Sequence, residues 1–181
     1  PAPGQPGTHS NFTPHEPEIF IAVLSDGHIV AFNGHVDLGT GIRTALAQIV
    51  AEELNVAFES VTMVLGNSVE APNQGPTIAS ASIQITAEPL RRAAAQAREY
   101  LLTLAAQHLA TERSLLSCQN GAITLSDNER SSVSVGELLR GTRHALKLDD
   151  EVPLKPVSDY TLVGQSTSRV DIPAKATGQL T

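Results

Sequence analysis

The chain is poor in aromatic residues and in sulfur. Its 181 residues include no tryptophan, one cysteine (Cys118) and one methionine, and aromatic side chains make up only 3%. A single cysteine excludes a disulfide within the chain and cannot hold an iron–sulfur cluster, which needs a set of protein ligands. We therefore expect Cys118 to be a buried, inert thiol. The core must be built from alanine, leucine, isoleucine and valine packed closely together.

Long apolar runs and a positive net charge are absent as well. The sequence has no run of about 18 apolar residues, the length that a membrane-spanning helix needs. Its formal net charge is −7 at pH 7. An acidic surface repels the phosphate backbone, which argues against a nucleic-acid-binding protein. The length and the 41% hydrophobic content are enough for one domain with a real core.

The first third of the chain has readable periodicity. Residues 1–17 are rich in proline and glycine and are expected to form a flexible arm. Apolar residues alternate over 18–24 and 28–36, and the Asp-Gly pair between these segments favours a hairpin turn. A one-sided apolar stripe predicts a helix over 42–54.

The remainder predicts a buried strand over 61–65 and a long helix over 88–111, with Pro89 in the first turn. A short strand over 122–125 and a short helix over 135–141 follow. This order of elements indicates an α+β fold, in which a small mixed or antiparallel sheet packs with two main helices.

Two pairs of adjacent charged residues are expected at the surface. Glu52 and Glu53 occupy neighbouring helix positions whose side chains point apart, which is typical of solvated acids. Arg91 and Arg92 fall in the first turn of the predicted 88–111 helix and are interpreted as surface charges.

The most informative segment joins the second predicted strand to the first predicted helix through Gly39, Thr40 and Gly41. Glycine permits a positive φ and a close approach of a ligand to the backbone. The N-terminus of the following helix offers N–H groups and a positive dipole end to an anion. From these residues alone, a ligand-binding loop and a plain tight turn remain equally open.

Three blocks of sequence carry a family resemblance. They read GHVDLGTGIRTALAQIVAEEL at 34–54, GPTIASAS at 75–82 and VGQSTSRVDIPAKATG at 163–178. Together and in this order, they resemble the large subunits of molybdenum hydroxylases, the xanthine dehydrogenase/aldehyde oxidase family. The likeness is greatest to the β subunits of the isoquinoline 1-oxidoreductase and nicotinate dehydrogenase type.

The resemblance implies a molybdopterin-binding-like α+β domain over 18–155, followed at 156–181 by a linker and the start of a hammerhead α/β domain. It also implies that the chain is an N-terminal fragment of the large subunit. The residues expected to contact the molybdopterin cofactor are Gly39, Thr40, Gly41, Ile42, Gly75, Thr77, Ala79, Ser80, Ala81 and Ser82. No metal ligand is assigned.

The resemblance further implies a chemistry and a set of partners. Such enzymes hydroxylate a carbon of an aldehyde or an N-heteroaromatic compound, with water as the oxygen source. Electrons leave through an iron–sulfur or cytochrome subunit. The glutamate expected to act as general base lies outside these residues, so no catalytic residue is assigned. The isolated chain is expected to hold no cofactor and to be inactive.

Thr40 departs from the family pattern, because many members carry glutamine at this position. The shorter hydroxyl reaches less far toward a metal centre, whereas the backbone role of Gly39 and Gly41 is unaffected. The departure keeps open a non-catalytic interaction or scaffold domain with the same fold. A dinucleotide-binding domain is disfavoured, because the fingerprint's third glycine is replaced by Thr44 and the preceding strand is expected to be a hairpin partner rather than part of a βαβ unit.

The proline-rich start resembles the region that follows an export signal in isoquinoline-type subunits. We therefore expect a periplasmic protein, with the cytoplasm as the alternative. The single cysteine fits either compartment.

Overall fold

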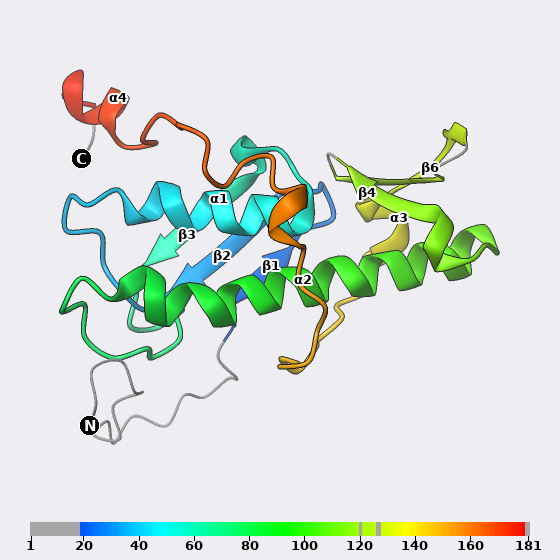
Figure 1. Cartoon of the computed structure of the whole chain (residues 1–181), viewed down its shortest axis with the longest axis horizontal. Helices are drawn as coiled ribbons and strands as arrows, with labels where there is room; N and C mark the ends of the chain where they lie inside the picture. The colour runs from blue at the N-terminus through cyan, green and yellow to red at the C-terminus, as the bar shows by residue number, and fades with distance from the viewer. Residues whose placement is uncertain (1–18, 120, 126–127, 180–181) are drawn as a thin grey trace.

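The fold consists of two small sheets connected by one long helix (Figure 1). The computed structural model describes residues 19–119, 121–125 and 128–179. In the first sheet, β1 (Ile21–Val23) pairs antiparallel with β2 (Ile29–Asn33), and β2 pairs parallel with β3 (Val61–Leu65). Helix α1 (Ile42–Leu54) connects the two parallel strands. Strand β2 is thus both a hairpin partner and the first strand of a βαβ unit, so the expectation that it is only the former was wrong.

The long helix α2 (Ser82–Leu109) contributes to two separate hydrophobic clusters. Its first half packs Ala87, Leu90 and Ala94 against α1 and the first sheet. Its second half packs Leu101 and Ala105 against the second sheet. The core consists largely of aliphatic residues and alanine, as the composition predicts.

Helix α2 begins six residues before the predicted start at 88, so Pro89 lies inside the helix and not in its first turn. A proline in a helix interior removes one backbone hydrogen bond. The flanking residues Thr86, Ala87 and Leu90 are buried, at 0%, 7% and 0% exposure. Their packing holds the segment helical on both sides of the proline.

The second sheet is antiparallel and covers the far end of α2 (Figure 1). It contains β4 (Leu116–Gln119), β5 (Ala122–Leu125) and β6 (Asn128–Ser134), and it leads into α3 (Val135–Leu139). Only β5 and α3 were predicted. Cys118 of β4 is buried, and burial raises the pKa of its thiol to about 11, as expected of an inert cysteine. The α+β fold class is confirmed.

The C-terminal segment passes along α1 and ends in α4 (Ile172–Ala176) (Figure 1). The amide of Gln48 on α1 donates to the carbonyls of Leu162 and Gln165 at 3.1 Å each. The predicted boundary at 155/156 stays a prediction, and the predicted arm at 1–17 lies outside the described residues. Single-turn 3-10 helices occur at Phe58–Ser60, Arg113–Leu115 and Val157–Asp159. Within the described ranges, no helix is both long and apolar enough to cross a membrane.

Candidate functional site

The two sequence blocks expected to bind a cofactor meet at one end of the molecule, where α1 and α2 both begin (Figure 1). Residues of both blocks line one cavity of about 470 Å³. This volume falls in the range of small-molecule sites, about 300–1,000 Å³. Residues far apart in the sequence are therefore brought together around one hollow.

Seven of the ten predicted contact residues line this cavity: Thr40, Gly41, Ile42, Thr77, Ala79, Ser80 and Ser82. The other three do not line it. Gly39 and Gly75 lie close to lining residues in the chain, and Ala81 is buried at 7% exposure. The remaining lining residues are apolar: Val36, Leu38, Ala45, Ile78 and Ile83.

The backbone around the cavity has positive φ angles, which residues with a Cβ atom rarely adopt. Gly39 and Gly41 have φ of 95° and 80°, so the Gly-Thr-Gly turn needs both glycines. Across the cavity, the non-glycine residues Ala79 and Ser80 have φ of 56° and 53°. Two consecutive left-handed residues of this kind are uncommon, and such strain gathers at ligand-binding segments.

The helix N-terminus at the turn is already occupied by a carboxylate of the chain. One Asp37 oxygen accepts the N–H groups of Gly39 and Gly41 at 2.9 and 3.1 Å, and the other accepts that of Arg43 at 3.2 Å. Burial alone would raise the pKa of Asp37, but these N–H groups and the nearby Arg169 guanidinium lower it below its usual value. The N–H groups expected to face an external anion therefore bind Asp37 instead.

This arrangement counts against a dinucleotide site. In that site the pyrophosphate sits at the N-terminus of the helix that follows the first strand. Here Asp37 fills that position at the start of α1. The dinucleotide alternative is thus disfavoured by Asp37, although the βαβ connection itself is present.

Arg169 from the third sequence block holds the same turn from the other side. Its guanidinium donates to the carbonyl of Gly39 at 2.6 Å and forms an ion pair with Asp171, also at 2.6 Å. A Cβ atom added at Gly41 would lie 3.4 Å from the Arg169 side chain. Asp37 therefore fixes the turn by accepting the N–H groups of Gly39 and Gly41, and Arg169 fixes it by donating to the Gly39 carbonyl. Neither role was predicted from the sequence.

The segment after β2 is tied to the loop that precedes α2. The N–H of Gly34 donates to the Gln74 side chain at 2.8 Å, and the N–H of Val36 donates to the Thr77 hydroxyl at 2.9 Å. A Cβ atom at Gly34 would lie 2.2 Å from the carbonyl oxygen of Pro72, so only glycine fits there. These contacts fix the segment after β2 relative to the loop before α2, and both segments line the cavity.

Asp37 supplies a test of the turn. Asparagine at position 37 keeps one acceptor oxygen but loses the second oxygen and the negative charge. We expect Asp37→Asn to destabilise the domain by about 1–2 kcal/mol, measured by thermal unfolding. The control Asp26→Asn should be nearly neutral, because Asp26 accepts one N–H, from His28, with one oxygen. Equal effects of the two substitutions would contradict the assigned role of Asp37.

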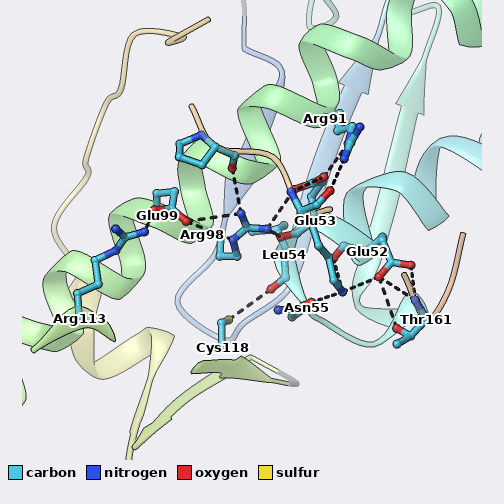
Figure 2. A network of polar contacts seen from close by, with 12 residues as sticks. Glu52, Glu53, Leu54, Asn55, Arg91, Arg98, Glu99, Arg113, Cys118 and Thr161 are labelled. Atoms are coloured by element: carbon cyan, nitrogen blue, oxygen red, sulfur yellow. Dashed lines mark hydrogen bonds and ion pairs between the residues drawn. The ribbon is translucent and has the colours of Figure 1, made fainter. Parts of the chain in front are cut away.

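Glu52 at the end of α1 is buried, at 2% exposure, so the prediction of a solvated acid was wrong (Figure 2). Its carboxylate accepts the Lys155 ammonium at 2.6 Å and the N–H groups of Thr161, Leu162 and Val163, the last two at 2.6 and 2.8 Å. Burial alone would raise the pKa of Glu52, but these donors lower it to about 2. Glu52 therefore anchors the C-terminal segment to α1.

Glu53 is equally buried, at 1% exposure, and pairs with two arginines of α2 (Figure 2). Its two oxygens lie 2.6 Å from Arg91 Nε and 3.0 Å from Arg98 Nη1. Arg91 also stacks over the ring of Tyr160, 5.5 Å from its centroid. The prediction that Arg91 is a surface charge was therefore wrong. Glu52 and Glu53 do point apart, but both are covered by the returning chain.

The acidic pair lies away from the 470 Å³ cavity and serves to hold the fold together. Every oxygen of the pair is bound by cations and N–H groups of the chain itself. Across the described ranges, no group of three or more histidine, cysteine, aspartate or glutamate side chains could hold a metal ion.

A family model described as "Molybdopterin cofactor-binding domain" matches residues 2–177. A nicotinate dehydrogenase subunit of Pseudomonas putida is 56% identical over 163 residues, which are 90% of this chain and 14% of that protein. The beta subunit of isoquinoline 1-oxidoreductase from Brevundimonas diminuta is 29% identical over 203 residues, 90% of this chain and 26% of that protein. The chain thus spans well under half the length of these relatives.

Solved structures share the fold. CO dehydrogenase from Oligotropha carboxidovorans matches with a TM-score of 0.58 at 24% identity, over 65% of this chain and 15% of that chain. Quinoline 2-oxidoreductase from Pseudomonas putida 86 matches with a TM-score of 0.54 at 19% identity, over 71% of this chain and 17% of that chain. These likenesses support the α+β arrangement of sheet and helices.

Proposed function

Because the chain belongs to the molybdopterin cofactor-binding domain family, we propose that it forms one wall of the molybdopterin site in the large subunit of a molybdenum hydroxylase. The observation that carries the proposal is the cavity lined by seven of the ten residues expected to contact the cofactor. The molybdenum cofactor, when bound, supplies two-electron redox chemistry. This chain contributes binding and orientation, and no catalytic base.

The residues around the cavity fit such a group. Gly41 has no side chain, so a ligand can approach the backbone there. Thr77, Ser80 and Ser82 present hydroxyls for hydrogen bonds. Four apolar residues at the cavity are exposed to solvent: Val36, Leu38, Ile78 and Ile83, at 40%, 71%, 51% and 46%. An exposed apolar rim around a hollow is typical of a surface that another part of a protein covers. The other wall of the site would come from the rest of the large subunit.

For the substrate class we propose an N-heteroaromatic compound, hydroxylated at a ring carbon with water as the oxygen source. This proposal is supported by the 56% identity to a protein named as part of nicotinate dehydrogenase and by the likeness to the beta subunit of isoquinoline 1-oxidoreductase. An aldehyde is the second candidate substrate. The pocket walls that choose between them would lie largely outside this chain.

Partners and location are part of the same proposal. The single cysteine of this chain provides too few ligands for an iron–sulfur cluster. The electron acceptor that we propose is an iron–sulfur or cytochrome subunit, as the family resemblance implies. Export to the periplasm remains the proposed location. Fractionation of cells that express the whole gene tests it, and recovery of the enzyme wholly in the cytoplasm would refute it.

The function is tested by molybdenum and pterin analysis of the whole enzyme. We expect about one molybdenum per large subunit in the purified whole protein, and none at stoichiometric level in the isolated 181-residue chain. The reason is that one wall alone leaves the cofactor open to solvent. A whole protein free of molybdenum and pterin would refute the proposal and favour a scaffold role. A fully loaded isolated chain would refute the division of the site between segments.

A further inference from the structure

A buried histidine lies directly behind the cavity, bonded to one of the hydroxyls that line it. His35 follows β2 and is 1% exposed. Its Nδ1 lies 2.7 Å from Ser82 Oγ, and its Nε2 lies 3.3 Å from the carbonyl oxygen of Gln74. The backbone N–H of His35 donates to the Asn33 side chain at 3.0 Å, which fixes the residue further.

The Gln74 carbonyl determines which ring nitrogen of the neutral His35 imidazole carries the proton. A carbonyl oxygen can only accept, so Nε2 must carry the hydrogen and donate it. Nδ1 is then left as an acceptor, and the Ser82 hydroxyl must donate to it. The hydroxyl hydrogen of Ser82 is thus directed away from the cavity. Only the oxygen lone pairs of Ser82 remain for a ligand.

The Ser82 side chain has no competing structural task at the start of α2. Ala81 is the N-cap residue, and among the described residues no side chain caps this helix end. Ser82 lines the cavity together with Thr77, whose hydroxyl already accepts the N–H of Val36 and so keeps its own hydrogen free to donate. The two hydroxyls therefore present opposite polarity to a ligand.

We propose that His35 is a positioning residue that fixes Ser82 as a hydrogen-bond acceptor, so that the cavity recognises an N–H or O–H donor on its ligand. The inference rests on the proposed function and adds the polarity of one contact to it. A ligand edge with a ring N–H or an amino group satisfies Ser82. A ligand edge that carries only acceptors leaves two sets of lone pairs opposed and is rejected.

A double-mutant cycle in the purified holoenzyme tests the inference. The measurement is the rate of cofactor release at fixed temperature, followed by pterin fluorescence, for Ser82→Ala, His35→Leu and the double variant. We expect each single substitution to speed release about tenfold, and the double variant to be no faster than either one. His35→Asn should release the cofactor at nearly the wild-type rate, because its amide oxygen can replace Nδ1 as acceptor.

The inference would be overturned if the double variant speeds cofactor release by the product of the two single effects. It would also be overturned if Ser82→Ala leaves the release rate unchanged. The unfolding midpoint of the cofactor-free protein detects a merely structural role of His35. In that case His35→Leu lowers the midpoint by the same amount with serine or with alanine at position 82. If His35→Leu does not fold, Ser82→Ala and His35→Asn decide the question by themselves. Absence of pterin from the wild-type enzyme refutes the proposed function, and multiplying effects in a loaded enzyme refute only the role of His35.

Discussion

Replacing Glu53 with glutamine is expected to destabilise this domain by about 3 kcal/mol or more. The substitution leaves the volume of the side chain almost unchanged but removes the negative charge that pairs with two arginines. Arg98 is 9% exposed, and its guanidinium would lose the carboxylate at 3.0 Å and keep only that of Glu99 at 3.5 Å. Arg91 would lose its 2.6 Å partner. Arg91 and Arg98 would keep backbone carbonyl acceptors, but loss of the closest carboxylate beside a buried charge is among the most destabilising single changes.

The matched control is Glu88→Gln on α2. Glu88 pairs with Arg92 at 2.9 Å, but its side chain is 63% exposed. Exposed pairs of this kind contribute little to stability, because solvent screens the attraction between the charges. Hydrogen exchange of the α1 and α2 amides in the intact protein reads the stability of this domain alone. Equal protection in the two variants would contradict the assigned role of Glu53, whereas faster exchange in Glu53→Gln alone would support it.

Replacing Gly41 with valine should abolish cofactor loading of the whole enzyme. The φ of 80° at Gly41 disfavours a β-branched side chain, and the new Cβ would be in van der Waals contact with the Arg169 side chain at 3.4 Å. Gly41 also lines the cavity, so the side chain narrows the space for the ligand. The backbone strain displaces the turn that Asp37 and Arg169 hold. The measurement is molybdenum and pterin per large subunit.

Gly27→Val is the control for backbone strain. Gly27 has a similar φ of 85° in the hairpin turn before β2, and among the described residues nothing lies within 4 Å of a Cβ there. This variant should lose stability but keep its cofactor. A loaded Gly41→Val enzyme would show that the turn is only structural. Equal cofactor loss in both variants would assign the effect to strain alone.

The sequence predicted the elements that carry strong local signals. The stripe over 42–54 matches α1 residue for residue, and 61–65 matches β3. The 122–125 segment also matches β5. Strands β4 and β6 were missed because β4, LSCQ, holds only two apolar residues and β6, NERSSVS, carries no alternating apolar pattern. Their pairing with β5 supplies the order that local sequence does not.

Long-range contacts account for the errors about charged residues. Glu52 is buried because residues 161–163, about 110 positions later, cover its carboxylate and donate to it. Neither the helix pattern nor the adjacent position of Glu53 encodes that contact. Asp37 was detectable, since an aspartate commonly accepts the backbone N–H two residues later, as it does here from Gly39. The cavity residues were found through the family resemblance, because hydroxyl and glycine residues alone have no diagnostic spacing.

The most direct test of the proposed cofactor site is an experimental structure of the whole enzyme with its cofactor bound. We expect the organic part of the cofactor to contact the backbone of Gly41 and the segment from Ala79 to Ser82, with the apolar rim at Leu38 and Ile78 covered by the rest of the large subunit. A cofactor bound elsewhere, with this cavity filled by protein side chains, would contradict the proposal.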